Sequence, residues 1–420
     1  MRNNPLVFLL VFSAIILVID AYAYWGVRKL AANSKRGIRR TVWILFWIVP
    51  VILISGVALF ATLRIPPSDY LRYIHFISGT FILFYLPKLI FILFNLLEDL
   101  LHLGRKLRVR IRQKKKEETV PGEAISRNQF LTRAGLLLAA VPFFSIAYGI
   151  KWGRFNYTVR NLELRFENLP ARFDGLRIVQ ISDFHIGSFL DYADEVETAV
   201  EFINAQRGDL LLFTGDFVNN VASEMNPFLS SLRKLRASMG KYSILGNHDY
   251  GEYVPWPSAE EKQRNLQTLV DLQEDLGFRM LLNDHQRIQR GGEHIELIGV
   301  ENWGLPPFPQ YGDLEKARMG VEPDAFTILL SHDPTHWDAQ VMGHTDIDLT
   351  LSGHTHGAQF GIEIPGWRWS PVSMRYRRWG GLYEEGNQYL NVNTGIGFIG
   401  FPGRVGMPPE VTVIELRKAV

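Results

Sequence analysis

The chain has 420 residues, of which 47% are hydrophobic and 21% are charged, and its formal net charge is +2. This near-neutral charge argues against a nucleic-acid-binding protein, and the absence of cysteine excludes disulfides, thiolate metal sites and cysteine nucleophiles. Long apolar runs are concentrated in residues 1–150, whereas residues 151–420 have the composition of a folded soluble domain. We therefore expect two domains, a membrane region over 1–150 and a separately folded domain over 151–420.

Three apolar runs in the first hundred residues are long enough to cross a bilayer. They occupy residues 5–25, 41–63 and 71–97, and about 20 apolar residues in a helix span the roughly 30 Å of hydrocarbon. A fourth run, 134–150, is shorter and contains Pro142. The sequence therefore predicts three or four transmembrane helices.

Charged residues within and between these runs predict how the membrane region is arranged. Asp20, near the end of a run, should reach water, and Lys88 should extend its ammonium group to the interface. Basic residues are concentrated in the first loop and in residues 98–133, and loops of this kind face the cytoplasm. If the fourth run crosses, residues 151–420 lie outside the cytoplasm, as we expect; if it lies on the surface, they are inside. The first loop has no acid and contains six cations: Arg28, Lys29, Lys35, Arg36, Arg39 and Arg40.

From about residue 157 the pattern changes to short apolar segments that alternate with amphipathic ones. Many strands with interspersed helices predict an α/β or α+β layered domain, although periodicity does not tell how the strands pair. The predicted strands are 176–182, 209–214, 241–245, 294–300, 325–331, 347–352, 388–393 and 411–416. The predicted helices are 192–206, 224–237, 259–276 and 311–319.

Polar clusters follow five of the predicted strands at the points where the apolar segments end. Strand ends are rigid positions from which side chains can form a site. The clusters combine imidazoles with carboxylate and amide oxygens, a ligand set that suits Mn, Fe or Zn. The sequence therefore predicts a metal site made of these clusters: Asp183-Phe184-His185, Gly215-Asp216, Gly246-Asn247-His248-Asp249, Ser331-His332-Asp333 and Gly353-His354-Thr355-His356.

The five clusters, in this order, resemble the signature of the calcineurin-like metallophosphoesterases: D-x-H, G-D, G-N-H-[DE], a lone His, and G-H-x-H. The chain is similar to the bacterial membrane-associated branch of that family. The resemblance covers residues from about 155 to 420 and implies a double-sheet sandwich flanked by helices, preceded here by the helical membrane region. It also implies an integral protein of the bacterial cell membrane.

The resemblance implies two divalent metal ions, with manganese expected and iron, zinc or a mixed pair as alternatives. Asp216 would bridge both ions, His248 would stay uncoordinated as the acid for the leaving group, and Asp249 would orient His248. The first ion would be completed by His356. No cluster departs from the family pattern at a ligand. The implied metal ligands are Asp183, His185, Asp216, Asn247, His332, His354 and His356.

We therefore expect an enzyme, a metal-dependent phosphoric ester hydrolase in which a metal-bridging hydroxide attacks phosphorus. Two divalent ions carry more charge than Asp183, Asp216 and one hydroxide cancel, so the site attracts an anionic phosphate. The expected substrate is a lipid-linked or membrane-associated phosphoester. No nucleic-acid partner is expected, and no protein partner can be inferred. The alternatives are a membrane sensor or scaffold with a retained metal site, and a phosphodiesterase for soluble or nucleotide substrates.

An aromatic and basic segment follows the last cluster, over residues 365–382. Two interpretations are open: a surface loop packed on its own aromatic rings, or an interfacial loop whose rings and guanidinium groups contact lipid headgroups. Its aromatic and basic residues alternate: Trp367, Arg368, Trp369, Arg375, Tyr376, Arg377, Arg378 and Trp379.

Overall fold

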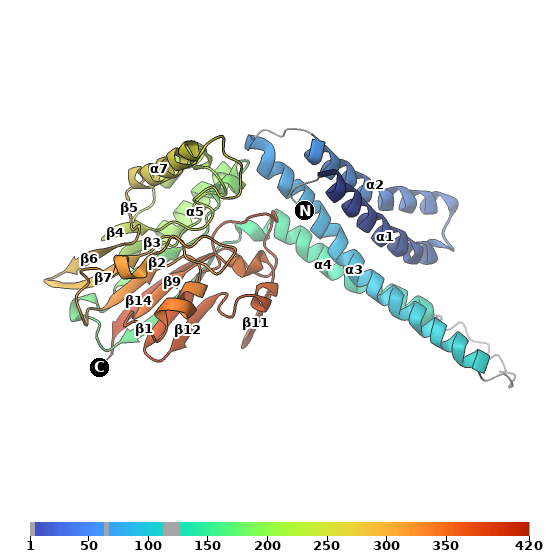
Figure 1. Cartoon of the computed structure of the whole chain (residues 1–420). Helices are drawn as coiled ribbons and strands as arrows, with labels where there is room; N and C mark the ends of the chain where they lie inside the picture. Colours follow the sequence, from blue (N-terminus) through green and yellow to red (C-terminus); the bar gives the residue numbers. More distant parts are fainter. Residues whose placement is uncertain (1–4, 63–66, 112–126, 420) are drawn as a thin grey trace. The chain divides into compact units, whose positions relative to one another are not determined.

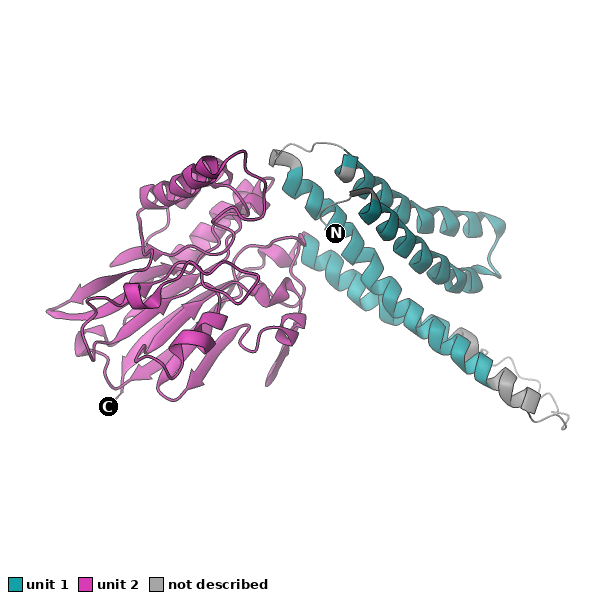
Figure 2. Ribbon diagram, viewed as in Figure 1, with its two compact units in different colours: residues 1–150 teal, residues 151–420 magenta. Residues whose placement is uncertain are grey.

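The computed structural model describes residues 5–62, 67–111 and 127–419. The chain divides into two compact units, Met1–Ile150 and Lys151–Val420 (Figure 2). Part of the basic run predicted within 98–133, residues 112–126, lies outside the described residues. The two units are treated separately below.

Four long helices form the described part of unit 1 (Figure 1). Each contains a segment long and apolar enough to cross a membrane, including Phe130–Lys151, the segment that the sequence left open. Pro142 lies inside that last helix, and prolines are tolerated in membrane helices. The helices are α1 (Pro5–Ala31), α2 (Arg36–Thr62), α3 (Pro67–Ile111) and α4 (Arg127–Lys151).

Two charged residues inside the apolar runs, Asp20 and Lys88, are paired with each other. Asp20 is completely buried, and its carboxylate lies 2.5 Å from the Lys88 ammonium group and also accepts a hydrogen bond from Tyr85. The expectations that Asp20 reaches water and that Lys88 extends to the interface were therefore wrong. A buried charge is costly unless it is paired, and this pair ties α1 to α3.

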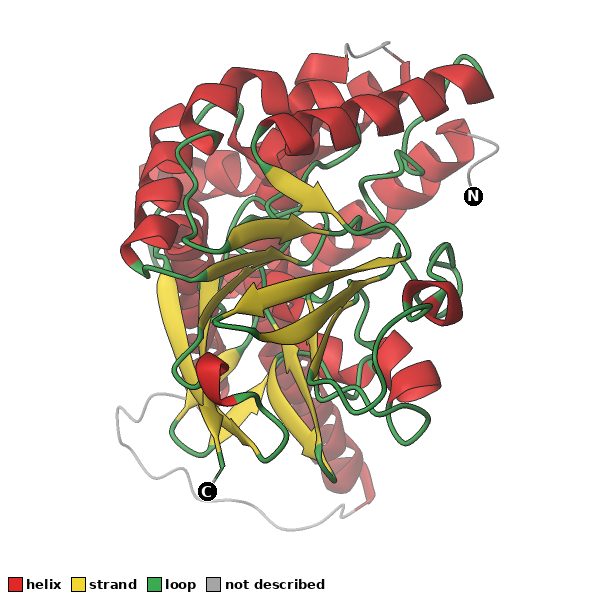
Figure 3. Cartoon of the chain, turned by 90° about the vertical axis from the view of Figure 1, so that its left-hand side faces the viewer, coloured by secondary structure: helices red, strands yellow, loops and turns green. Residues whose placement is uncertain are grey.

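Residues 158–418 of unit 2 form two six-stranded sheets and a two-stranded hairpin, β10 (Ile362–Ile364) with β11 (Trp367–Trp369) (Figure 3). The first sheet has the order β1-β14-β2-β3-β4-β5, with β1 Thr158–Phe166, β2 Arg177–Ile181, β3 Leu210–Phe213, β4 Gly240–Ser243, β5 Phe278–Met280 and β14 Glu410–Lys418. The second has the order β12-β13-β9-β8-β7-β6, with β6 Asp284–Arg290, β7 Glu293–Gly299, β8 Thr327–Leu330, β9 Leu349–Ser352, β12 Gly381–Glu385 and β13 Gln388–Val392.

The two sheets pack face to face through the apolar side chains that line the facing side of each. Along β3, Leu210 and Leu212 join the core between the sheets, together with Leu297 and Ile328 of the second sheet. The alternate residue Leu211 joins a core that also contains buried residues of α5 (Ala193–Ala205) and α7 (Ala259–Asp275). Successive side chains of a strand point to opposite faces of the sheet, so a strand that is covered on both faces contributes alternate residues to the two cores. The predicted double-sheet sandwich flanked by helices is confirmed.

Two predicted helices are shorter than expected. The segment predicted as helix 224–237 is a 3-10 helix, Ala222–Phe228, followed by the short α6 (Leu229–Leu232). Pro227 lies in this segment and cannot donate a backbone hydrogen bond, which disfavours a regular helix there. The segment predicted as 311–319 is helical only over α8 (Leu314–Ala317).

Candidate metal centre

The five polar clusters lie just beyond the carboxyl ends of β2, β3, β4, β8 and β9. In the first sheet, β2, β3 and β4 run parallel to one another, and in the second, β8 runs parallel to β9. Each sheet therefore presents its clusters at a common edge. Five cluster residues have a left-handed backbone, which costs a non-glycine residue roughly 1 kcal/mol or more and is typical of functional sites. They are Asp183, His185, Asp216, His354 and His356.

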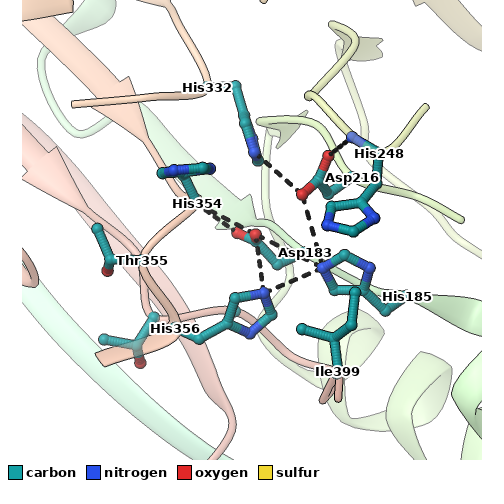
Figure 4. Close-up of polar contacts among 12 residues, drawn as sticks. Asp183, His185, Asp216, His248, His332, His354, Thr355, His356 and Ile399 are labelled. Atoms are coloured by element: carbon teal, nitrogen blue, oxygen red, sulfur yellow. Dashed lines mark hydrogen bonds and ion pairs between the residues drawn. The ribbon is translucent and has the colours of Figure 1, made fainter. Parts of the chain in front are cut away.

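Asp183, His185 and His356 form the first group of ligand atoms, and all three are buried (Figure 4). His356 Nε2 lies 3.1 Å from Asp183 Oδ1 and 3.0 Å from His185 Nε2. His185 Nδ1 lies 3.2 Å from the Val218 carbonyl oxygen and donates to it. The Nε2 of His185 therefore presents a lone pair to the other two side chains, as a metal-binding histidine does.

Asp216, His332 and His354 form the second group. His332 Nδ1 lies 2.7 Å from the Thr214 carbonyl oxygen, which again leaves Nε2 free. Asp216 Oδ2 lies 3.1 Å from His332 Nε2 and 3.6 Å from His185 Nε2, so a single oxygen faces both groups (Figure 4).

Asn247 lies beside the second group. Its Oδ1 is 2.8 Å from His354 Nδ1, and the Nε2 on the other side of that ring lies 2.8 Å from the Tyr376 hydroxyl. The structure thus brings together all seven side chains that the sequence singled out as ligands.

The arrangement is compatible with a divalent metal site. His332 Nε2 is buried and has no hydrogen-bond partner among the described residues, although a carboxylate oxygen lies 3.1 Å away. A buried imidazole nitrogen that faces a carboxylate in this way fits a cation between them. Imidazole and carboxylate donors suit Mn, Fe or Zn.

Electrostatics in the protein alone show how strongly the site attracts positive charge. Burial lowers the pKa of His332, but the Asp216 carboxylate outweighs burial and raises this pKa to about 10. Burial raises the pKa of Asp216, and the His332 and His248 imidazoles outweigh it, so that the pKa is well below its usual range. A bound cation would replace these protons, since both stabilise the same anion.

His248 lies beside both groups. Its Nδ1 is 2.7 Å from the Asn219 carbonyl oxygen, and its ring is perpendicular to that of His185 at a centroid distance of 4.9 Å (Figure 4). Its backbone N–H donates to Asp216 Oδ1 at 2.8 Å. Burial lowers the pKa of His248.

Asp249, which was expected to orient His248, contacts backbone amides. Its buried carboxylate accepts hydrogen bonds from the backbone N–H groups of Asp216 at 2.9 Å and Gly246 at 2.9 Å, and also from Phe217 at 2.9 Å. The carbonyl of Asn219, rather than Asp249, holds the His248 ring. Asp249 instead joins the loop after β3 to the loop after β4, because its carboxylate accepts hydrogen bonds from backbone amides of both loops.

The comparisons with known proteins agree with this geometry. The family model "Calcineurin-like phosphoesterase" matches residues 176–358, and "Probable Calcineurin-like phosphoesterase, transmembrane domain" matches residues 2–154. The metallophosphoesterase YkuE of Bacillus subtilis is 31% identical over 304 residues, which cover 70% of this chain and 98% of YkuE. This chain belongs to the calcineurin-like metallophosphoesterases. A bovine protein named "Transmembrane protein with metallophosphoesterase domain" is 29% identical over 71% of this chain and 63% of its own length.

This metallophosphoesterase is therefore a phosphoric ester hydrolase that carries membrane helices. Several side chains near its ligands were not predicted. No sequence pattern indicates that Tyr253 belongs to the site. Its hydroxyl lies 2.7 Å from Asn247 Nδ2, and its ring centroid lies 4.4 Å from that of His248. Glu224 is buried and accepts a backbone hydrogen bond from Asn219, at 2.6 Å, and thereby supports the carbonyl that holds His248. Burial raises the pKa of Glu224 to about 7.

The aromatic and basic segment of the metallophosphoesterase divides into two parts. Tyr376 and Trp379 are buried and form a small core with Met407. Trp367 and Trp369, on the hairpin strand β11, are 52% and 42% exposed. The second half of the segment is therefore packed on its own aromatic rings, as the first interpretation expects, whereas the tryptophans of the hairpin are exposed.

Proposed function

We propose that this metallophosphoesterase uses two metal ions to hydrolyse a lipid-linked or otherwise membrane-associated phosphoester. Both ions are expected to be manganese. The observation that carries the two-ion assignment is Asp216 Oδ2, which lies within 3.6 Å of a histidine nitrogen from each ligand group. The first ion is assigned to Asp183, His185 and His356, with Asp216 as the shared ligand. The second is assigned to Asn247, His332 and His354.

We assign each side chain of the site a separate role in hydrolysis. When bound, the two ions would supply Lewis acidity toward the phosphate and lower the pKa of a water molecule. His248 is the assigned acid: because Nδ1 donates to Asn219, Nε2 is the atom left to pass a proton to the departing oxygen. Asp249 and Glu224 hold the loops that place Asp216 and His248, through the backbone contacts described above.

The membrane helices and the hairpin support a substrate at the membrane surface. Exposed apolar side chains lie on both hairpin strands: Ile362, Ile364, Trp367 and Trp369. Exposed apolar patches mark membrane or protein interaction sites, and tryptophan is enriched at bilayer interfaces.

A hydrolysis screen of the detergent-purified full chain with Mn²⁺ tests the proposal. The substrates are phospholipid phosphoesters in mixed micelles and bis(p-nitrophenyl) phosphate in solution, at matched accessible concentrations. We expect metal-dependent turnover of both, with kcat/KM higher for the micellar substrate. A higher value for the soluble ester would favour the soluble-substrate alternative, and stoichiometric metal without turnover of any ester would favour the sensor alternative.

A further inference from the structure

A basic cavity lies in unit 1 between the end of α1 and the beginning of α2. Its volume is about 530 Å³, within the range of ligand pockets. The two helices pack side by side here, with the Tyr24 ring 5.4 Å from that of Phe46. The side chains that carry the argument are Tyr24, Trp25, Arg28 and Lys29 from α1 and Arg39 and Val42 from α2.

Part of the positive charge at the cavity has no acidic partner among the described residues. Lys29 is paired with Asp99, at 3.1 Å, and lies 3.5 Å from Glu98. Arg28 and Arg39 make no ion pair with any residue that the structure describes. Residues 21–68 contain no aspartate or glutamate. Two exposed guanidinium groups at one cavity fit an anion, and their planar donor geometry fits the oxygens of a phosphate.

The same cavity lies at the level where a lipid headgroup would be. The candidate spans Val7–Ala31 and Arg36–Phe60 end and begin at the loop beside it. Trp25 lines the cavity and is 61% exposed, and Trp43, the neighbour of Val42 in sequence, is 51% exposed. Tryptophans gather at the membrane–water interface, where their rings lie among headgroups and acyl chains.

We propose that this cavity binds the phosphate headgroup of an anionic phospholipid. Arg28 and Arg39 contact the phosphate oxygens, Trp25 packs beside the glycerol backbone, and the acyl chains follow the exposed apolar surface of α1 and α2. The basic first loop faces the cytoplasmic leaflet, in which anionic lipids are found. The site belongs to unit 1, whereas the metal ligands belong to unit 2, so the proposal does not depend on the assigned reaction.

Lipid retention by the full chain tests the site. Wild-type protein is reconstituted in phosphatidylcholine nanodiscs with a titrated fraction of phosphatidylglycerol, and bound lipid is counted by native mass spectrometry. Each cation near an anionic headgroup contributes roughly fivefold in affinity. We therefore expect Arg28→Gln with Arg39→Gln to weaken phosphatidylglycerol binding by at least about tenfold.

Arg36→Gln with Arg40→Gln is the matched control, because it removes the same charge from exposed positions of the same loop that do not line the cavity. This pair loses the long-range attraction of two cations but no direct phosphate contact, so it should weaken binding several-fold less than the cavity pair, and helix content by circular dichroism should be unchanged in both double variants. Three outcomes would each overturn the proposal. The two double variants could lose the same affinity for phosphatidylglycerol, or wild-type protein could retain phosphatidylcholine as well as phosphatidylglycerol. Inorganic phosphate at matched concentration could also displace the lipid.

Discussion

At the scale of single residues, Asp216 is the carboxylate that faces both ligand groups. One of its carboxylate oxygens faces a histidine of each ligand group, and the other accepts the His248 backbone N–H. We predict that Asp216→Asn lowers both metal content and hydrolysis by more than about 100-fold, since loss of a ligand should exceed the 10–100-fold cost of losing an outer-shell partner. Metal content is measured by mass spectrometry of the purified protein.

Asp348→Asn is a suitable control for that experiment. Asp348 is also a buried carboxylate, but it accepts a hydrogen bond from the Thr327 backbone, at 2.7 Å, and one from Asn168, at 2.9 Å. This variant should lose stability and keep its metal. Full metal retention in Asp216→Asn would contradict the shared-ligand assignment.

His248 is predicted to affect rate without affecting metal. The His248 Nδ1 is hydrogen-bonded to the Asn219 carbonyl oxygen, and His248 lies beside the two ligand groups rather than within them. His248→Ala should retain metal and lose roughly 10²–10⁴-fold in kcat if it acts as general acid. The loss should shrink for p-nitrophenyl esters, whose leaving group needs no proton. Loss of metal together with rate would instead make His248 a ligand.

The side chains that meet at the candidate metal centre could be predicted from sequence because they lie in short, ordered clusters. The neighbours could not. Tyr376 contacts His354 across 22 residues of chain, and Arg404 lies 3.4 Å from His356 across 48. Neither contact has a local pattern, because both arise only when the segments after β9 fold back on the site. Asp249 was identified within its cluster, but its hydrogen-bond partners are backbone amides, and a pattern of side chains does not predict such partners.

At the scale of elements, the strands that are buried along their whole length were predicted, whereas the missed strands are partly exposed. β3, β8 and β9 are rich in leucine and buried throughout. β1 mixes charged with apolar residues, β6 has Ile288 as its only apolar residue, and both are edge strands, so their periodicity is weak. Pairing was also beyond prediction: β1 lies parallel to β14, which follows it by some 250 residues, with Thr158 opposite Glu410.

The β10–β11 hairpin carries a prediction of its own. Trp367 and Trp369 are exposed, so their replacement by serine removes apolar surface without opening a core. We expect Trp367→Ser with Trp369→Ser to lower turnover of a micellar phospholipid ester several-fold and to leave turnover of a soluble ester nearly unchanged. Trp379 is unsuitable for this test because it is buried.

Met319→Ser provides the matched control for the hairpin, since Met319 is an apolar residue that is 70% exposed elsewhere in unit 2. It should change neither turnover. Equal losses on both substrates in the tryptophan variant would assign the hairpin a structural role, and no loss on either would remove its role at the membrane.

At the scale of the whole molecule, the number of membrane crossings decides the compartment of the catalytic domain. Four helices have the length and composition of a span, and Phe130–Lys151 leads directly into unit 2. With an even number of crossings, both ends of the chain lie on the same side of the membrane. The basic first loop contains Arg28, Arg36 and Arg40 and no acid, so the positive-inside rule predicts that it lies in the cytoplasm.

These two facts together predict that the catalytic domain is outside the cytoplasm. The first loop follows one crossing and the domain follows four, so an odd number of crossings, three, separates them. An alkaline phosphatase reporter fused after Val420, which folds only outside the cytoplasm, should be active, whereas a fluorescent reporter that requires the cytoplasm should be dark. Protease added to spheroplasts should also digest the domain. Complete protection in spheroplasts, followed by digestion after lysis, would mean that Phe130–Lys151 does not cross, and the enzyme would then act on phosphoesters of the cytoplasmic leaflet.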